Sequence, residues 1–173
     1  MMLEFDRPDR CVIGTVGQPG NRLFLIQVAQ GGQLAAVALE KQQAQLLGVR
    51  VAEVLDQLAD LGHDVPPEQA PADMGPLDAP VNVDFRAAAI GLAWDSDSQR
   101  LVLELFSVEA DEYSGENSLL QVRLTPAMAR EFSGRAAVIV ASGRPACPAC
   151  GQPLDPGGHI CPRANGYRGD LFS

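Results

Sequence analysis

The stretch RCVIGTVGQPGNRLFLIQVAQGGQLAAVALE, residues 10–40, carries the pattern that decides the fold. Two apolar, β-branched runs, Arg10–Gly17 and Arg22–Gln30, flank QPGN, whose Pro and Gly stand where a tight turn requires them. These two runs predict a β-hairpin. Gly31 and Gly32 form a second turn signal, and Gln33–Glu40 reads as a third strand. The stretch therefore predicts a three-stranded antiparallel sheet.

After residue 40 the apolar residues change from a strand period to a helical one. They fall on one helical face, which consists of Leu47, Val51, Val54, Leu55, Leu58 and Leu61. Gly62 is a natural end for this helix. Gly48 costs about 1 kcal/mol relative to Ala in a helix, so the first turn is expected to be irregular.

The strand pattern returns after a proline-rich segment. Residues 63–80 hold five prolines and no periodicity, which predicts a linker or a surface crossover. Further strands are predicted within 81–95, 100–108 and 119–124. Thr125 and Pro126 then form a favoured start for a second helix, which should run to about Ala141. AAVIV at 136–140 could by itself be a strand, and that outcome would break the repeat described next.

The order strand-strand-strand-helix thus occurs twice, which predicts an internal repeat. Four residue identities recur at an offset of 85, namely Leu39/Leu124, Ala44/Ala129, Arg50/Arg135 and Ala52/Ala137. The predicted fold class is α+β, with two strand-strand-strand-helix repeats on antiparallel sheets. We expect a two-repeat domain over 1–143, with repeats 10–62 and 84–142 that superpose. The linker 63–80 should lie outside the core, and a separate tail should span 144–173.

Charge and hydropathy exclude several classes of protein. The net charge is −9, and residues 64–143 hold thirteen acidic and five basic side chains, so binding to a phosphate backbone is disfavoured. No apolar run approaches the roughly 20 residues that cross a bilayer, so no membrane association is expected. The N-terminus MMLEFDRPDR lacks an apolar signal core. We expect a cytoplasmic protein, in which disulfides are disfavoured and clustered cysteines bind metal or do catalysis.

CPACGQPLDPGGHICP, residues 147–162, holds three of the four cysteines and one of the two histidines. Cys147 and Cys150 have the spacing of a zinc knuckle, and His159 and Cys161 leave the same face of an extended segment. Four such ligands suit a tetrahedral Cys₃His site for Zn²⁺. A site filled by four protein ligands is structural, and the remaining interpretations are a redox dithiol or inert thiols.

Three blocks resemble a known family. CVIGTVGQPGNRLFLIQ at 11–27, VALEKQQ at 37–43 and CPACGQPLDPGGHICPRANGY at 147–167 are similar to an uncharacterised actinobacterial family, domain-of-unknown-function family 3090. That family is encoded with a histidine-phosphatase-like and a phosphatidylinositol-kinase-like protein. The resemblance implies a zinc tail and a bacterial cytosolic setting, and it supplies no catalytic residues.

The remaining candidate sites have simpler structural interpretations. GTVGQPG at 14–20 lacks the Lys-Ser/Thr of a P-loop and is interpreted as part of a hairpin. Cys11 is expected in the core, and His63 on an exposed loop. The acidic set Glu104, Glu109, Asp111, Glu112 and Glu116 matches no EF-hand spacing and is interpreted as a solvated face. The tail arginines Arg144, Arg163 and Arg168 could contact an anion.

Two functions follow from these patterns. The first is a non-enzymatic binding or adaptor protein that docks an unidentified protein partner and carries a structural zinc. The second is an enzyme with an active site between the repeats, acting on a phosphorylated or small polar substrate. For the second, the place to examine is the strand-to-helix junction formed by Glu40, Lys41, Gln42 and Gln43.

Overall fold

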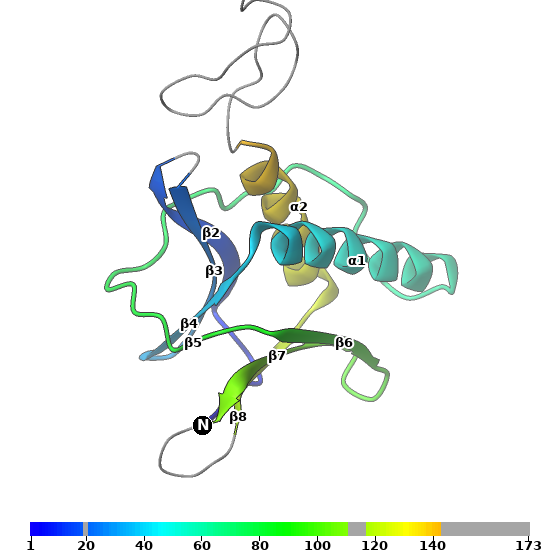
Figure 1. Ribbon diagram of the computed structural model, residues 1–173. Coiled ribbons are helices and arrows are strands. Elements are labelled where there is room, and N and C mark those ends of the chain that lie inside the picture. The colour runs from blue at the N-terminus through cyan, green and yellow to red at the C-terminus, as the bar shows by residue number, and fades with distance from the viewer. Residues whose placement is uncertain (19–20, 111–116, 143–173) are drawn as a thin grey trace, which may run out of the picture. The chain divides into compact units, whose positions relative to one another are not determined.

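The computed structural model describes residues 1–18, 21–110 and 117–142. The predicted order of three strands and a helix occurs in both halves, and each half has an additional short strand in front (Figure 1). The elements are β1 (Met2–Phe5), β2 (Arg10–Gln18), β3 (Asn21–Gln30), β4 (Gln33–Leu39), α1 (Lys41–Asp60), β5 (Phe85–Arg86), β6 (Ala89–Asp95), β7 (Arg100–Ala110), β8 (Asn117–Leu124) and α2 (Pro126–Ala141).

Local sequence explains where both helices begin and end. The side chain of Glu40 accepts the N3 backbone N–H, and Gln43 returns a hydrogen bond to the Glu40 backbone, so α1 starts with a capping box. Gly62 has a φ of 94°, which suits the residue after a helix. Thr125 Oγ1 accepts the Met128 N–H at 3.1 Å and caps α2. Residues 136–140 lie within α2, as predicted.

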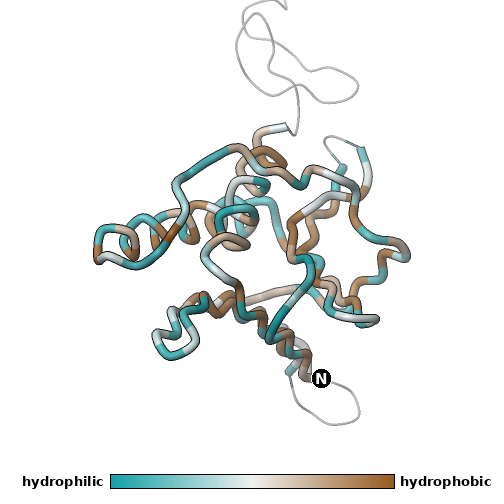
Figure 2. The backbone as a smooth tube through the Cα atoms, turned by 180° about the vertical axis from the view of Figure 1, so that it is seen from behind, coloured by the Kyte–Doolittle hydropathy of each residue, from teal (hydrophilic) through white to brown (hydrophobic). Residues whose placement is uncertain are grey.

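Two details of the predicted α1 are wrong. The first turn is regular, because α1 is continuous from Lys41. Leu61 does not join the buried face, since it is the C-cap residue and 76% exposed. The predicted face is otherwise found: Leu47, Val51, Leu55 and Leu58 are buried and Val54 packs against the core. Hydrophobic and hydrophilic residues accordingly alternate along α1 (Figure 2).

The sheets differ from the predicted antiparallel, three-stranded ones. Each is four-stranded and mixed, with the orders β1-β8-β7-β6 and β2-β3-β4-β5. β1 pairs in parallel with β8, and β5 pairs in parallel with β4. The first strand of each half therefore completes the sheet of the other half. Sequence periodicity could not show this exchange, because pairing between distant strands leaves no local pattern.

The exchange follows the 85-residue offset of the repeat. Phe5 lies opposite Val122 and Phe85 lies opposite Val37, and these two valines are 85 residues apart (122 − 37). Both helices start at positions with the same offset, Lys41 and Pro126. These correspondences are those of a two-fold repeat. That the two halves superpose stays a prediction.

A single hydrophobic core joins both sheets and both helices. It includes Phe5 of β1, Ile13 of β2, Leu55 of α1, Leu103 of β7 and Phe132 of α2, each fully buried. Fully burying one such side chain stabilises the fold by about 1.5–3 kcal/mol. Because both halves contribute side chains to this core, it stabilises the two halves together. Neither half has a core of its own.

The two helices cross at a small residue. A Cβ placed on Gly48 would lie 3.0 Å from the Cβ of Ala136 and 3.9 Å from the Ser133 carbonyl oxygen. Gly48 and Ser133 are again 85 residues apart. A glycine at this position lets the α1 backbone approach α2 more closely than any side chain allows.

The proline-rich segment 63–80 forms an ordered crossover on the surface. None of its residues is buried, but it makes polar contacts with three elements. Gln27 of β3 exchanges two hydrogen bonds with the Asp78 backbone, at 2.7 and 2.9 Å. Arg130 of α2 donates to the Pro66 carbonyl, and Glu131 accepts the Ala72 N–H. The segment thus closes over β3 and α2.

The chain divides into two compact units. The first consists of Met1–Val16 and Leu23–Val140 and contains the core, and the second consists of Gly17–Arg22 and Ala141–Ser173. Of the second unit, the structure describes residues 17–18, 21–22 and 141–142. The predicted boundary between a body at 1–143 and a tail at 144–173 falls outside the described residues and stays a prediction. No helix in the described part of the chain is long and apolar enough to cross a membrane.

The helix crossing generates a first prediction. Gly48→Leu should destabilise the protein by about 1–3 kcal/mol, because the added side chain must enter the packed contact with Ala136. Urea unfolding measures the effect. Gln45→Leu, at an exposed position of the same helix, is the control and should change stability little. Equal stability of the Gly48 variant and the control would contradict the close crossing.

Candidate functional site

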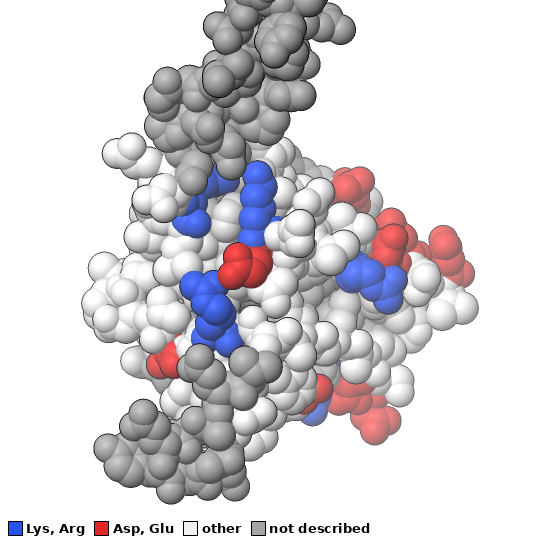
Figure 3. Space-filling view, viewed as in Figure 1, with Lys and Arg blue, Asp and Glu red and all other residues white. Residues whose placement is uncertain are grey.

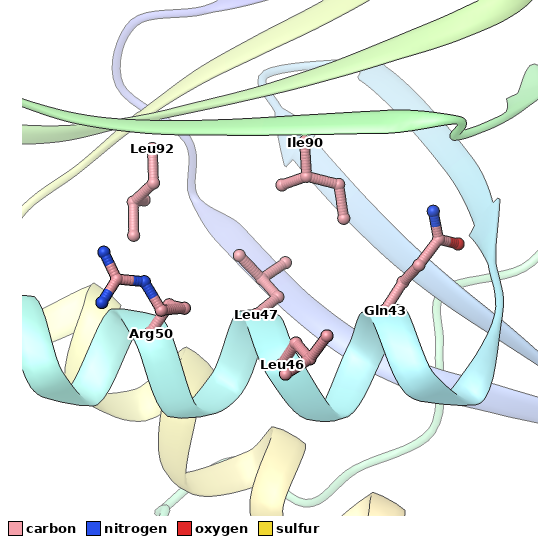
Figure 4. Close-up of a pocket in the computed structure, with 6 residues that line it drawn as sticks. All are labelled: Gln43, Leu46, Leu47, Arg50, Ile90 and Leu92. Atoms are coloured by element: carbon pink, nitrogen blue, oxygen red, sulfur yellow. The ribbon is translucent and has the colours of Figure 1, made fainter.

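A groove of about 380 Å³ runs between α1 and β6. Leu47 is buried at its floor, whereas Leu46 is 65% exposed on its wall. Figure 4 shows the aliphatic side chains of Ile90 and Leu92 pointing from β6 toward α1. Polar groups enter only from α1, through Gln43 and Arg50. The complete lining is Gln43, Leu46, Leu47, Arg50, Ile90 and Leu92.

Helical and strand periods together place these residues on facing surfaces. Leu46 and Arg50 are four residues apart and so lie on one stripe of α1. Ile90 and Leu92 alternate with Gly91 and therefore share one face of β6. Leu46 lies just beside the buried stripe, so the period that predicted the core face of α1 left it unassigned. The signal that could have shown the groove is the exposed apolar residue next to that face.

Strand β6 lies at the edge of its sheet, since it pairs with β7 on one side and ends the strand order. Its sequence AIGLAWD contains no lysine and no proline. Within the described residues, no side chain bonds to the backbone of Ala89–Trp94. An apolar edge strand beside an apolar groove is the arrangement to which an extended polypeptide adds as a further strand.

The predicted junction residues lie at one end of this groove. Gln43 Oε1 accepts the Glu40 N–H at 2.7 Å, and Gln43 Nε2 donates to the Ala87 carbonyl at 3.2 Å. The Glu40 carboxylate accepts a hydrogen bond from Arg86 at 2.9 Å. Glu40 and Gln43 thus join α1 to the chain that leads into β6, while Lys41 and Gln42 are exposed. These hydrogen bonds hold α1 next to the start of β6 at one end of the groove.

The largest charged cluster among the described residues is Arg10, Asp73, Asp78 and Arg135. Arg10 donates to both Asp73 oxygens, at 2.7 and 3.1 Å. Arg135 is 3% exposed and donates to the carbonyls of Ile13, at 2.6 Å, and Asp73, at 2.9 Å. The Arg10 hydrogen bond holds the pKa of Asp73 below its ordinary value, while burial lowers the pKa of Arg135. Since these donors are occupied by the fold itself, the cluster fastens segment 63–80 to β2 and α2.

The structure confirms the prediction made for Cys11 and contradicts the one made for His63. Cys11 is buried, as predicted, and burial raises the pKa of its thiol to about 12, so it is a neutral core residue. The prediction of an exposed His63 is wrong. His63 is half-buried and its ring meets Trp94 edge-on, with centroids 5.3 Å apart, because the chain turns back over β6 after Gly62.

The glycine-rich stretch at 14–20 does not lead into a helix. Gly14 and Gly17 lie in β2, and β3 follows, so the described residues agree with a hairpin.

Glu104 lies in β7 and its carboxylate accepts a hydrogen bond from Gln121 at 3.0 Å. Glu109 is within β7, and the other members of the predicted acidic set, Asp111, Glu112 and Glu116, lie outside the described residues.

The predicted zinc ligands Cys147, Cys150, His159 and Cys161 lie outside the described residues, as do Arg144, Arg163 and Arg168. In residues 1–18, 21–110 and 117–142, no group of three or more His, Cys, Asp or Glu side chains could hold a metal ion. The zinc site therefore stays a prediction from the tail sequence.

Fold and groove together define a class: an α+β protein of two mixed four-stranded sheets and two crossed helices, with one open sheet edge. Over residues 3–161 the chain matches the family described as Protein of unknown function (DUF3090), and it belongs to that family. No curated protein and no solved structure matches it. The resemblance inferred from the three sequence blocks is confirmed.

The charged cluster generates a prediction about pH. The pKa of Asp73 in the folded state lies below its ordinary value of about 3.9. The charged Asp73 therefore stabilises the fold above about pH 3.9, and this stabilisation is lost as the pH falls through the folded-state pKa. Asp73→Asn should therefore lower the melting temperature at about pH 6 and lower it much less at about pH 2.5. Exposed Asp64→Asn is the control. A melting-temperature difference that stays constant with pH would contradict the ion pair.

Proposed function

We propose that this protein is a non-enzymatic binding protein whose body accepts an extended polypeptide strand at the edge of β6. The observation that carries the proposal is the open edge strand beside the apolar groove. A strand that paired with β6 would satisfy backbone hydrogen-bonding groups along the edge, and its alternate side chains would meet Leu46, Ile90 and Leu92. The segment bound is therefore extended, with apolar residues at every second position.

The charge of the surface supports a polypeptide ligand. Most of the face in Figure 3 is neither acidic nor basic, and the charged side chains lie in small separate groups. At the groove, Arg50 is paired with Glu53 at 2.8 Å. An edge strand whose one charged residue, Asp95, is paired with Arg123 suits a partner recognised through its backbone and apolar side chains.

A random peptide library displayed on phage tests the groove directly. The protein, immobilised so sparsely that copies do not meet, should enrich peptides with alternating apolar residues. Leu46→Lys should abolish this enrichment, because a charge would then stand on the groove wall. Leu61→Lys changes an exposed leucine at the C-cap of the same helix, outside the groove, and should leave selection intact. Enrichment that survives Leu46→Lys, or no enrichment by the unchanged protein, would overturn the proposed site.

We further propose that the tail holds one structural zinc through Cys147, Cys150, His159 and Cys161. The support is their spacing, which suits a closed tetrahedral Cys₃His site with zinc–sulfur distances of about 2.3 Å. Zinc would fold a segment that has little apolar content of its own, and it would leave the body to bind the partner.

Metal analysis and one substitution test the zinc site. Protein purified without chelator should hold about one zinc per chain, and Cys150→Ser should lose it, because a hydroxyl is a poor substitute for a thiolate. Hydrogen exchange should then rise within about 145–165 and stay unchanged in β3 and β7, whose residues belong to the separate core. Metal-free protein would refute the site. Lost protection throughout β3 and β7 would show that the tail is part of the core.

A further inference from the structure

Residues 66–78 of the crossover, here called the strap, are bound to the rest of the protein in the manner of a peptide ligand. In Figure 1 the crossover passes from α1 across α2 and then beside β2 and β3. The strap contains no helix or strand, and its main chain is held by side chains of the body. These side chains are Arg130, Glu131 and Arg135 of α2, Arg10 of β2 and Gln27 of β3. Main-chain hydrogen bonds to an extended segment are a basis of peptide recognition by folded domains.

Three of the side chains that bind the main chain of the strap are themselves buried. Gln27, Arg130 and Arg135 are 2%, 6% and 3% exposed. The Gln27 amide donates to the Asp78 carbonyl at 2.9 Å and accepts the Asp78 N–H at 2.7 Å. Arg130 and Arg135 each donate to a carbonyl of the strap, at 2.8 and 2.9 Å. A buried amide without hydrogen bonds is costly, so Gln27 needs the backbone partner that the strap supplies.

Two side chains of the strap are recognised as well. The Asp73 carboxylate accepts hydrogen bonds from Arg10 at 2.7 and 3.1 Å and lies 3.5 Å from the Arg135 guanidinium. Leu77 packs on Gly14 of β2, where an added Cβ would lie only 2.6 Å from the leucine side chain. The glycine therefore leaves the space that the leucine occupies. The arrangement selects an extended segment in which Asp is followed by Leu four residues later.

Polar contacts rather than apolar burial fasten the strap. None of its residues is buried, and no backbone ladder within the described residues joins it to a sheet. Segments with little buried apolar surface open locally at a lower free energy than core strands. We therefore expect the strap to open while β3 and α2 stay folded.

The side chains that contact the strap form one surface, the strap surface, which consists of Arg10, Gly14, Gln27, Arg130, Glu131 and Arg135. We propose that the strap surface binds peptides, that the strap occupies it as an intramolecular ligand, and that a partner segment with the same spacing of Asp and Leu displaces the strap. The strap surface shares no residue with the groove beside β6, so this proposal does not depend on the proposed function. A tethered segment competes at an effective concentration on the order of millimolar. The strap thus keeps weak ligands out, and the surface is autoinhibited.

Weakening the strap should open the surface to a peptide in trans. The probe is a fluorescein-labelled peptide with the sequence of residues 64–80, added to the full chain. In the strap variant, Asp73→Ala with Leu77→Ala, the strap loses both selective contacts, while every side chain of the strap surface is retained. By fluorescence anisotropy this variant should bind the peptide with a Kd of about 100 µM or tighter, at least about tenfold more tightly than the unchanged protein.

Two controls separate this effect from a general loosening of the crossover. Glu68→Ala with Met74→Ala removes one exposed carboxylate and one exposed apolar side chain of the strap and should leave peptide binding at the level of the unchanged protein. A peptide with the substitutions Asp73→Ala and Leu77→Ala should bind the strap variant at least about tenfold more weakly, because it lacks both recognised side chains.

Hydrogen exchange shows whether the body stays folded when the strap opens. In the strap variant the amides of Ala72 and Asp78 should lose protection while β3 stays protected. Loss of protection throughout β3 would overturn the proposal, because the strap would then be part of the core. A folded strap variant that binds no peptide at about 1 mM, or that binds both peptides equally, would also overturn it. Adding Leu46→Lys to the strap variant should leave binding unchanged, and a loss of binding would assign the peptide to the groove beside β6 instead.

Discussion

Strand β1 of the first half completes the sheet of the second, and β5 of the second half completes the sheet of the first. This exchange requires both halves to fold together. Phe5 reaches the common core only because β1 pairs with β8, and the core includes buried residues from β2, β3, β4, β7, β8 and both helices. Since each sheet borrows a strand, neither half can bury its apolar face alone.

The helix crossing depends on the same arrangement. Gly48 of α1 and Ser133 of α2 meet near the centre, at positions 85 residues apart. A two-fold repeat brings equivalent positions together at its axis, and the residues there must be small for two helices to approach. The crossing, the helix starts and the two valines that lie opposite the exchanged strands therefore share one offset.

The two halves differ in the surroundings of equivalent residues. Arg50 and Arg135 are equivalent in sequence position, but Arg50 is exposed on the groove and Arg135 is buried under segment 63–80. The crossover exists only between the halves and covers β2, β3 and α2. At β6, the start of this segment sets the His63 ring against Trp94. Side chains and the crossover thus contact edge strand β2, whereas no side chain among the described residues bonds to the backbone of Ala89–Trp94 in β6.

The sequence by itself determined the two hairpins, the two helices with their starting residues, the strand-strand-strand-helix order of both halves and most of the buried face of α1. Each of these is encoded locally, by the period of apolar residues, by turn glycines and by caps such as Thr125. The sequence also indicated the family, because the resemblance rests on contiguous blocks of residues. The four tail ligands stay a prediction from spacing. Only the tertiary structure decided the mixed sheets, the burial of Arg135 and the groove. Which strand pairs with β1, and which strand faces Leu46 across the groove, depends on segments far apart in the chain. Such partners are chosen by packing rather than by local pattern.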